Sequence, residues 1–224
     1  MCTGEVTLRP IADVRSGFSS RFGIPRQSGL APSAEAEIIF RKAYRHQNYV
    51  RGLEDFSHIW VLWGFNGCAE KSPTVRPPRL GGNRRVGVFA TRSPYRPNPI
   101  AMSCVRLIGV AAEDGQLTLR IAGADMKNGT AVYDIKPYVL ADCHPEADMS
   151  FAGQPDNRLS VLDPDGALAA LPDDLRAVAS ELLALDPRPA YHTDPERVYA
   201  MEYGGFEVHF TVSDGTVTVR DVLP

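Results

Sequence analysis

The chain has 224 residues, of which 44% are hydrophobic, and its formal net charge is −3 at pH 7. This length is enough for one large domain or for a main domain with a smaller one beside it. No apolar run approaches the ~20 residues that a membrane helix needs, and residues 1–10 lack the basic-then-apolar order of a signal peptide. We therefore expect a soluble, cytoplasmic protein that makes no membrane contact.

The cysteines are scattered along the sequence, and so are the histidines. Cys2, Cys68, Cys104 and Cys143 form no C-x-x-C pair, and no spacing between a cysteine and a histidine is typical of a zinc site. Free thiols are compatible with a reducing compartment. The sequence therefore predicts a protein without a metal site.

Charge is divided unevenly along the chain. Residues 1–110 hold 16 Lys and Arg against 7 Asp and Glu, whereas residues 111–224 hold 8 against 20. Between Lys71 and Arg106 there are eight basic residues and no acidic one. This stretch predicts either a surface that binds a polyanion or one that pairs with the acidic half of the same chain.

The first part of the chain, to about residue 140, indicates many short β-strands separated by Gly and Pro. Residues 59–63 and 86–90 are apolar runs of strand length, rich in aromatic or β-branched residues. Residues 105–110 and 117–121 flank Asp114-Gly115, which is typical of a β-hairpin turn. Repeated short strands of this kind favour a sandwich or a barrel.

Residues 141–170 break this pattern with prolines, glycines and acidic residues, so we expect a linker or a peripheral loop there. Residues 173–185 begin with two aspartates, keep apolar residues at helical spacing and end before Pro187, which predicts a helix. Residues 206–212 and 217–219 alternate as strands around a Ser-Asp-Gly turn. This small unit is expected to pack on the first domain or on a partner subunit.

Five segments rich in Pro and Gly hold polar side chains at defined positions: residues 21–30, 56–66, 76–100, 125–130 with 134–138, and 186–191. Proline fixes the backbone and glycine permits tight turns, so such a loop loses little entropy when it binds a ligand. The segments are either ligand-binding loops or rigid structural turns. The sequence has no Rossmann glycine motif after a strand, no P-loop and no G-x-S-x-G elbow.

These segments closely resemble the TrmO family, also called YaeB-like or TsaA-like, through most of residues 6–140 and again at residues 186–191. The resemblance implies a mainly β protein: a non-Rossmann N-terminal β-barrel at residues 1–150 and a small C-terminal α/β domain at residues 151–224. The run from Val75 to Ser103 is long and distinctive. Single residues depart from the family pattern at Ala12, Ser28, Asn66, Ala101 and Ala131.

The resemblance also implies an activity. The chain would be an S-adenosylmethionine-dependent tRNA methyltransferase that works as a homodimer. Its substrate would be threonylcarbamoyl-adenosine immediately 3′ of the anticodon, methylated on the exocyclic nitrogen. The alternatives are a non-catalytic RNA-binding β-barrel, and a methyltransferase of the same fold that acts on another RNA or on a small molecule.

Candidate site residues follow from these motifs in three groups. The cofactor would be bound by Arg26, Gln27, Ser28, Asn66, Gly67, Arg92, Met102, Asp125, Asn128, Gly129 and Thr130. The tRNA backbone would contact Arg79, Arg84, Arg85 and Arg96. The target base and its proton acceptor would involve Asp134, Lys136, Tyr138, Asp186, Arg188 and Tyr191.

Within the third group, Tyr138 or Tyr191 would stack on the adenine. Lys136 or Arg188 would meet the threonine carboxylate, and one of the two aspartates would accept the proton. The alternative for Asp186 and Arg188 is that they only pair with each other and lock their loop.

Overall fold

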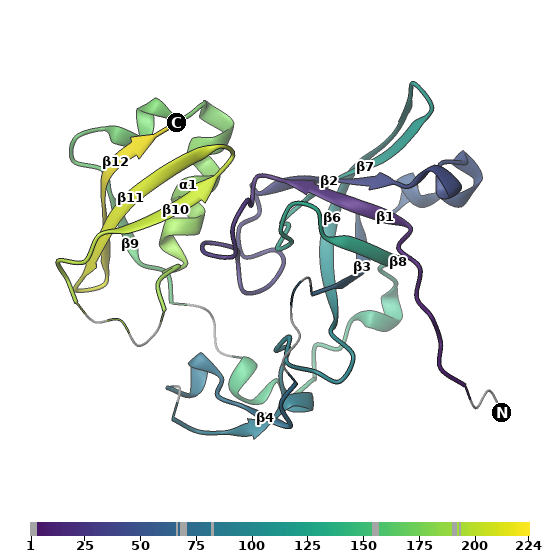
Figure 1. Ribbon diagram of the computed structural model, residues 1–224, viewed down its shortest axis with the longest axis horizontal. Coiled ribbons are helices and arrows are strands. Elements are labelled where there is room, and N and C mark those ends of the chain that lie inside the picture. Colours follow the sequence, from purple (N-terminus) through teal and green to yellow (C-terminus); the bar gives the residue numbers. More distant parts are fainter. Residues whose placement is uncertain are drawn as a thin grey trace.

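The computed structural model describes residues 4–65, 67, 71–81, 83–153, 157–189, 192 and 194–224. A closed barrel from the N-terminal part of the chain stands beside an open sheet from the C-terminal part (Figure 1). A small lobe, residues 71–99, projects away from both and carries most of the basic stretch; we call it the basic lobe. The predicted class, a mainly β protein with a barrel and a small C-terminal α/β unit, is confirmed.

The barrel has six antiparallel strands in the order β1-β2-β7-β6-β3-β8. Apolar residues at every second position point inward, as Ala36, Ile38 and Phe40 do on β2, and they fill the core. Closure leaves no free sheet edge, so ligand contacts fall to the loops at the strand ends. The strands are β1 Ala12–Ser16, β2 Glu35–Phe40, β3 His58–Gly64, β6 Ile100–Glu113, β7 Gln116–Ala122 and β8 Ala131–Pro137.

Two of the predicted barrel elements are confirmed. The apolar run at residues 59–63 lies within β3, and the predicted hairpin is formed by β6 and β7. Asp114 and Gly115 at its turn both have positive φ, 50° and 73°, as a type I′ turn requires.

The strand predicted at residues 86–90 is only partly formed. Strand β5 covers Val86–Gly87 and pairs with β4, Thr74–Val75, within the basic lobe. The next three residues form the 3-10 helix η5, Val88–Ala90, because the N–H of Thr91 bonds back to the carbonyl of Val88 at 3.1 Å and closes a turn. The prediction of a continuous strand was therefore wrong beyond Gly87.

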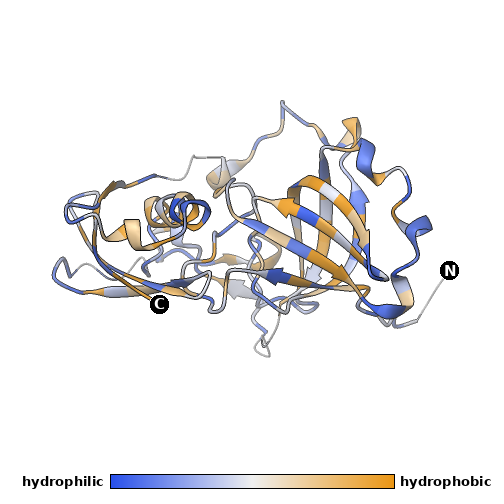
Figure 2. Cartoon of the chain, turned by 90° about the horizontal axis from the view of Figure 1, so that it is seen from above, coloured by the Kyte–Doolittle hydropathy of each residue, from blue (hydrophilic) through white to orange (hydrophobic). Residues whose placement is uncertain are grey.

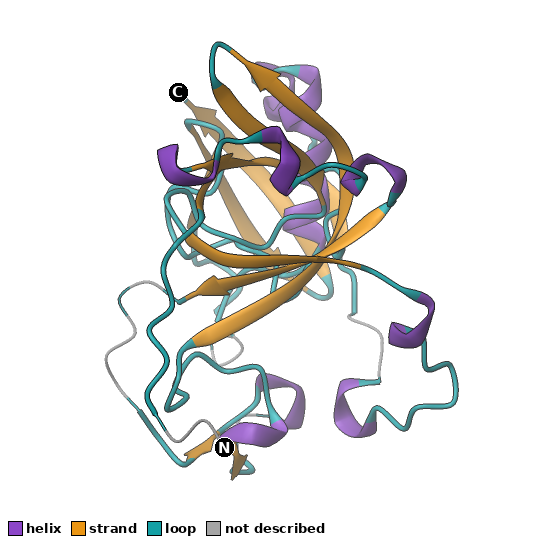
Figure 3. Ribbon diagram, turned by 90° about the vertical axis from the view of Figure 1, so that its right-hand side faces the viewer, coloured by secondary structure: helices purple, strands orange, loops and turns teal. Residues whose placement is uncertain are grey.

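Short 3-10 helices occupy the connections (Figure 3). One of them, η7 (Ser150–Ala152), folds back against η4 (Pro78–Leu80) of the basic lobe. There Arg79 donates to the carbonyl of Ala152 at 3.3 Å. The chain that leaves the barrel therefore supports the lobe before it enters the second unit. The 3-10 helices besides η5 are η1 Lys42–Tyr44, η2 Gln47–Tyr49, η3 Leu53–Asp55, η4 Pro78–Leu80, η6 Leu140–Asp142, η7 Ser150–Ala152 and η8 Ala167–Ala170.

The C-terminal unit is a four-stranded sheet in the order β10-β11-β12-β9, with helix α1 lying over one face (Figure 2). The predicted helix and hairpin are confirmed as α1, β11 and β12. The linker expected at residues 141–170 was partly wrong, because β9 lies in it and pairs parallel with β12. The elements are β9 Ser160–Leu162, α1 Asp173–Ala184, β10 Tyr199–Tyr203, β11 Phe206–Ser213 and β12 Thr216–Leu223.

The core of the C-terminal unit also takes in residues from the barrel half of the chain. Residues 17–34, which we call the β1–β2 connection, send Phe18, Ala31 and Ala34 into this core. The ring of Phe18 lies 5.0 Å from that of Tyr203, measured between centroids. The expected packing of the C-terminal unit on the first domain is therefore found. A domain boundary at residue 150 stays a prediction.

Candidate functional site

Three connections leave the barrel at the same end, where β1, β3 and β7 finish. They are the β1–β2 connection, the chain through the basic lobe, and residues 123–130. Arg92 of the lobe donates a hydrogen bond to Oε1 of Gln27 in the β1–β2 connection. The same guanidinium and the backbone of Ser28 favour the charged form of the Asp125 carboxyl group, so both act against the rise in its pKa. The structure thus brings together four of the candidate cofactor residues.

Asp125 is held from inside the barrel by a chain of hydrogen bonds. The indole Nε1–H of Trp63 on β3 donates to Oγ of Ser103 on β6 at 2.9 Å. The Ser103 hydroxyl in turn donates to Oδ1 of Asp125 at 2.6 Å. We call Gln27, Ser28, Arg92, Ser103 and Asp125 the Asp125 cluster.

The Asp125 carboxyl group has an unusual acidity. Burial disfavours its charged form and raises its pKa to about 6, against the opposing effects of the Ser103 hydroxyl, nearby backbone amides and Arg92. It is therefore mostly ionised at neutral pH and gains a proton in mild acid. A carboxylate of this kind beside an arginine suits a ligand that carries both a cation and an anion.

Asn128, Gly129 and Thr130 extend the same segment toward β1. The N–H of Asn128 donates to the carbonyl of Phe18 at 2.9 Å, and that of Gly129 to the carbonyl of Val14 at 2.8 Å. Gly129 has φ 77°, a left-handed conformation that glycine adopts without strain. This segment is thus fixed to β1 by its backbone, and Thr130 is buried.

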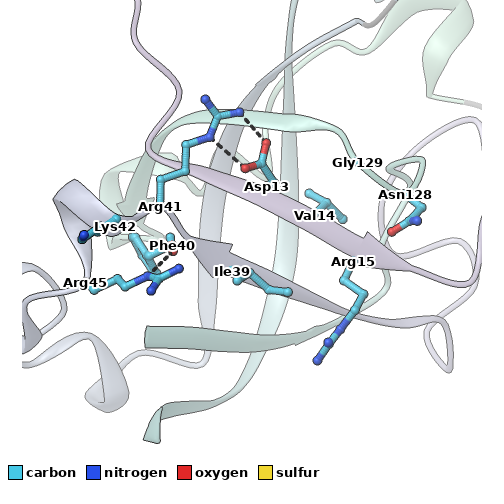
Figure 4. A pocket seen from close by; sticks show the side chains of 10 residues that line it. All are labelled: Asp13, Val14, Arg15, Ile39, Phe40, Arg41, Lys42, Arg45, Asn128 and Gly129. Atoms are coloured by element: carbon cyan, nitrogen blue, oxygen red, sulfur yellow. Dashed lines mark hydrogen bonds and ion pairs between the residues drawn. The ribbon is translucent and has the colours of Figure 1, made fainter. Parts of the chain in front are cut away.

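An open pocket of about 590 Å³ lies next to this segment, over the outer face of β1 and β2 (Figure 4). Arg41 spans it in an ion pair with Asp13, with N–O distances of 2.6 and 2.8 Å. Asn128 and Gly129 reach its edge, but the Asp125 cluster does not line it. The sequence analysis did not single out Arg41 or Asp13, because in the sequence each looks like an ordinary charged surface residue.

The other candidate cofactor residues are placed less uniformly. Met102 lies on β6 next to Ser103, and since successive strand residues face opposite sides, it points outward and is 46% exposed. Arg26 is exposed and its carbonyl accepts a hydrogen bond from the Gln27 side chain. Gly67 has φ 68°, and a Cβ there would lie 3.0 Å from Nη2 of Arg21. Asn66 lies outside the described residues.

Candidate residues for the target base form two separate sets. In the first, Lys136 pairs with Asp134 at 2.7 Å on β8. Tyr138 follows at the opposite end of the barrel from the Asp125 cluster, and its ring lies 6.0 Å from Trp60 and 6.4 Å from His58. Burial is the main cause that raises the pKa of Tyr138 above its usual value.

The second set lies in the loop between α1 and β10. Nε of Arg188 donates to both carboxylate oxygens of Asp186, at 2.9 and 3.2 Å. Asp186 has φ 52°, which is rare for a residue other than glycine. The two side chains line a pocket of about 490 Å³ with Ser213 and Asp214 of the β11–β12 turn. Tyr191 lies outside the described residues.

The two sets do not meet within one chain. Strand β8 lies on the side of the barrel away from the C-terminal sheet, whereas Asp186 and Arg188 belong to the C-terminal unit (Figure 1).

The candidate RNA-binding arginines all lie in the basic lobe, in different settings. Arg84 and Arg85 are exposed, and Arg85 donates to Oγ1 of Thr74 at 2.9 Å. Arg79 is exposed beside η7. Arg96 is more enclosed: it donates to the carbonyl of Thr91 at 2.6 Å and lies over the ring of Phe89. Arg96 therefore also holds the lobe together.

Both units of the fold match models of one family. The model for the tRNA-methyltransferase O N-terminal domain matches residues 13–143, and the model for the TrmO C-terminal domain matches residues 161–224. The chain belongs to the TrmO family.

Individual TrmO relatives match nearly the whole chain. The tRNA (adenine(37)-N6)-methyltransferase of Escherichia coli (strain K12) is 42% identical over 226 residues, which cover 96% of each protein. A putative S-adenosylmethionine-dependent methyltransferase of Pseudomonas aeruginosa is 41% identical over 91% of each. The crystal structure of TrmO from Pseudomonas aeruginosa superposes with a TM-score of 0.82, at 30% identity over 99% of both chains.

Two further observations concern the part of this TrmO chain that the structure describes. None of its helices is long and apolar enough to span a membrane. Its His, Cys, Asp and Glu side chains form no group of three or more that could hold a metal ion.

Sequence reasoning missed Trp63 and Ser103 as parts of the site. Both lie within strand β3 or β6 and look like ordinary members of a β-strand. The signal that could have found Ser103 is a single hydroxyl at an inward position between apolar ones.

Proposed function

We propose that this chain methylates the exocyclic nitrogen of threonylcarbamoyl-adenosine immediately 3′ of the tRNA anticodon. The coarser activity follows from its family: the chain is an S-adenosylmethionine-dependent methyltransferase that acts on adenine 37 of tRNA. The observation that carries the proposal is the match to the tRNA (adenine(37)-N6)-methyltransferase of Escherichia coli, which extends over nearly the full length of both proteins. A non-catalytic RNA-binding barrel has no comparable support.

The chemistry of the modified base suits such an enzyme. The exocyclic nitrogen belongs to a urea group, where its lone pair is delocalised and its proton is more acidic than in plain adenosine. S-adenosylmethionine supplies an electrophilic methyl group on a sulfonium. A carboxylate of the chain would accept the proton of that nitrogen as the nitrogen takes the methyl group from the sulfonium. Alignment of the reactants then supplies much of the rate.

The Asp125 cluster fits this cofactor by charge. S-adenosylmethionine carries a sulfonium cation and a carboxylate. Asp125 would supply a negative charge for the sulfonium, and the guanidinium of Arg92 would donate paired hydrogen bonds to the carboxylate. Gln27 and Ser28 approach the same point from the β1–β2 connection. The remaining proposed cofactor residues surround the cluster or extend from it: Arg26, Asn66, Gly67, Met102, Asn128, Gly129 and Thr130.

The basic lobe is the proposed contact surface for the tRNA backbone. Arg79, Arg84 and Arg85 are exposed on it, and the lobe is free of acidic residues. Arg96 completes the set from a more enclosed position. Arg79 also contacts the acidic half of the same chain, where it donates to the backbone carbonyl of Ala152.

We propose that a homodimer assembles the site for the target base. Asp134, Lys136 and Tyr138 of one copy would meet Asp186, Arg188 and Tyr191 of the other, since one chain alone keeps them apart (Figure 1). Arg188 is the better candidate for the threonine carboxylate, because its side chain is 20% exposed whereas that of Lys136 is 61% exposed. Because Arg188 pairs with Asp186, the threonine carboxylate would have to join or displace Asp186 at this cation, which plain adenosine could not do.

A reconstituted assay tests the proposal directly. The purified protein is incubated with S-adenosylmethionine and with tRNA that either carries or lacks the threonylcarbamoyl group, and the nucleosides are identified by mass spectrometry. We expect one added methyl group on the modified adenosine and none on plain adenosine. Equal methylation of both tRNAs would refute the proposed substrate while leaving the methyltransferase activity intact.

A further inference from the structure

A buried hydroxyl in the barrel has two partners that give it a direction. An indole N–H can only donate, so the hydrogen bond from Trp63 to Ser103 occupies the serine oxygen as an acceptor. The single hydroxyl proton of Ser103 is then directed to Oδ1 of Asp125. The chain of hydrogen bonds therefore runs one way, from the core of the barrel outward to the carboxylate.

The Ser103 hydroxyl is buried among apolar side chains, where a polar group is unfavourable unless it is hydrogen-bonded. Ser103 is 1% exposed and Trp63 is 8% exposed, between apolar neighbours such as Val61 and Val105. Burial of a hydroxyl costs free energy that its hydrogen bonds offset, so the presence of Ser103 here depends on its two partners. Its partners are the one indole at this point of β3 and the one carboxylate of the Asp125 cluster.

We propose that Ser103, oriented by Trp63, is a positioning residue that holds Asp125 charged and correctly turned to bind the cation of the cofactor. This inference rests on the proposed cofactor site at the Asp125 cluster. Because Ser103 is buried, it would act through Asp125 and not by contact with the cofactor. Its hydroxyl fixes Oδ1, one of the two carboxylate oxygens, and so limits how the carboxylate can turn.

The inference predicts a dependence on pH with a definite sign. The charged group that faces Asp125 is Arg92, while Ser103 and the Ser28 backbone contribute uncharged hydrogen-bonding groups. Burial raises the pKa of Asp125 to about 6, so acidification through that range removes its charge and should weaken cofactor binding. The Ser103 hydroxyl stabilises the charged form. Its removal raises the pKa further, and affinity is then lost at a higher pH.

The test is calorimetric titration of S-adenosylmethionine into the full-length protein between pH 5 and 8. Ser103→Ala should weaken binding at pH 7 roughly tenfold, the effect of one hydrogen bond to a charged group. It should also move the midpoint of the pH profile up by about one unit. Trp63→Phe, which keeps an aromatic ring but loses the N–H, should shift the midpoint in the same direction by less. Thr211→Val is the matched control: it removes a buried hydroxyl of the C-terminal unit and should change neither quantity.

The outcomes separate this inference from the proposed function. If Asp125→Asn and Arg92→Ala weaken binding but Ser103→Ala and Trp63→Phe keep the wild-type midpoint, Ser103 only satisfies the core and the inference is overturned. If Asp125→Asn and Arg92→Ala also bind normally, the cofactor lies elsewhere and both proposals about the site fail. If Ser103→Ala does not fold, as judged by circular dichroism, the Trp63→Phe midpoint decides.

Discussion

Two of the three connections that meet at the Asp125 cluster, the β1–β2 connection and the basic lobe, are stabilised in opposite ways. The β1–β2 connection contributes Phe18, Ala31 and Ala34 to the core of the C-terminal unit. Its first glycine allows a close approach: a Cβ at Gly17 would lie 2.8 Å from the Tyr203 ring. In the basic lobe, by contrast, Val88 alone is buried among the residues that the structure describes. Six prolines stiffen the backbone of the lobe.

The difference lies in where each connection obtains its rigidity. The β1–β2 connection depends on a second hydrophobic core, formed by residues near the end of the chain. The basic lobe depends on local restraints such as the hydrogen bond from Ser72 N–H to the carbonyl of Tyr95, at 3.0 Å. Damage to the C-terminal unit should therefore reach Gln27 and Ser28, whereas Arg92 should keep its place. The following predictions test this contrast, in order of decreasing effect.

Truncation after Leu171 should abolish both cofactor binding and turnover. It removes α1 and strands β10, β11 and β12, and so exposes Phe18 and the rest of the apolar side of the β1–β2 connection. Calorimetry and the nucleoside assay measure the two losses. A milder version, Leu182→Ala, deletes a fully buried side chain and should destabilise the fold by about 2–5 kcal/mol. Normal turnover by a folded truncated protein would show that the β1–β2 connection does not depend on the C-terminal core.

Arg92→Ala should weaken S-adenosylmethionine binding at least tenfold, which corresponds to about 1.4 kcal/mol. The change removes a cation from the cluster and the hydrogen bond to Gln27, but leaves the prolines of the basic lobe in place. Arg120→Ala is the control, since Arg120 pairs with Glu35 on the barrel surface and is half-exposed. Unchanged calorimetric affinity would remove Arg92 from the cofactor site.

The double substitution Arg84→Ala and Arg85→Ala should weaken tRNA binding and its dependence on salt. Each lost phosphate contact lowers the slope of log affinity against log salt by roughly 0.7–0.9. Cofactor affinity should stay at the wild-type value, because these side chains lie on the exposed part of the lobe. Binding measured over a range of salt concentrations decides; an intact slope would show that neither arginine contacts the backbone.

Glu181→Gln should have the smallest effect. Glu181 of α1 accepts hydrogen bonds from the Ser33 hydroxyl at 2.8 Å and from its N–H at 3.0 Å, which ties the β1–β2 connection to the C-terminal unit. Because Ser33 is exposed, we expect a loss of about 1 kcal/mol in the free energy of unfolding or less. Thermal denaturation measures it. A large loss of cofactor affinity in this variant would mean that the hydrogen bonds between Glu181 and Ser33 hold the β1–β2 connection in place more than its apolar packing does.

Much of the fold was accessible from local sequence pattern. The apolar run of β3, the Asp114-Gly115 turn and the helical spacing in α1 were all found where predicted. Strand β1 was missed because it has five residues and buries only Ala12 and Val14. The three residues of β9 are too few to show any period.

The candidate site was accessible only in part. Gln27, Ser28, Arg92 and Asp125 lie in motifs at strand ends, and they meet because their connections leave the same end of the barrel. The bond between Ser103 and Asp125 was not predictable, since it depends on which face of β6 turns inward. For the same reason, nothing in the motifs showed that Met102 points away from the cluster.

The contact between Phe18 and Tyr203 also imposes an order on biogenesis. Both residues belong to one core, yet the ribosome adds the second roughly 10–40 s after the first at ordinary rates of synthesis. All six barrel strands are translated before most of that core exists. A nascent or prematurely terminated chain therefore has the barrel strands without the core that supports Gln27 and Ser28. The proposed cofactor site would be completed only as translation ends.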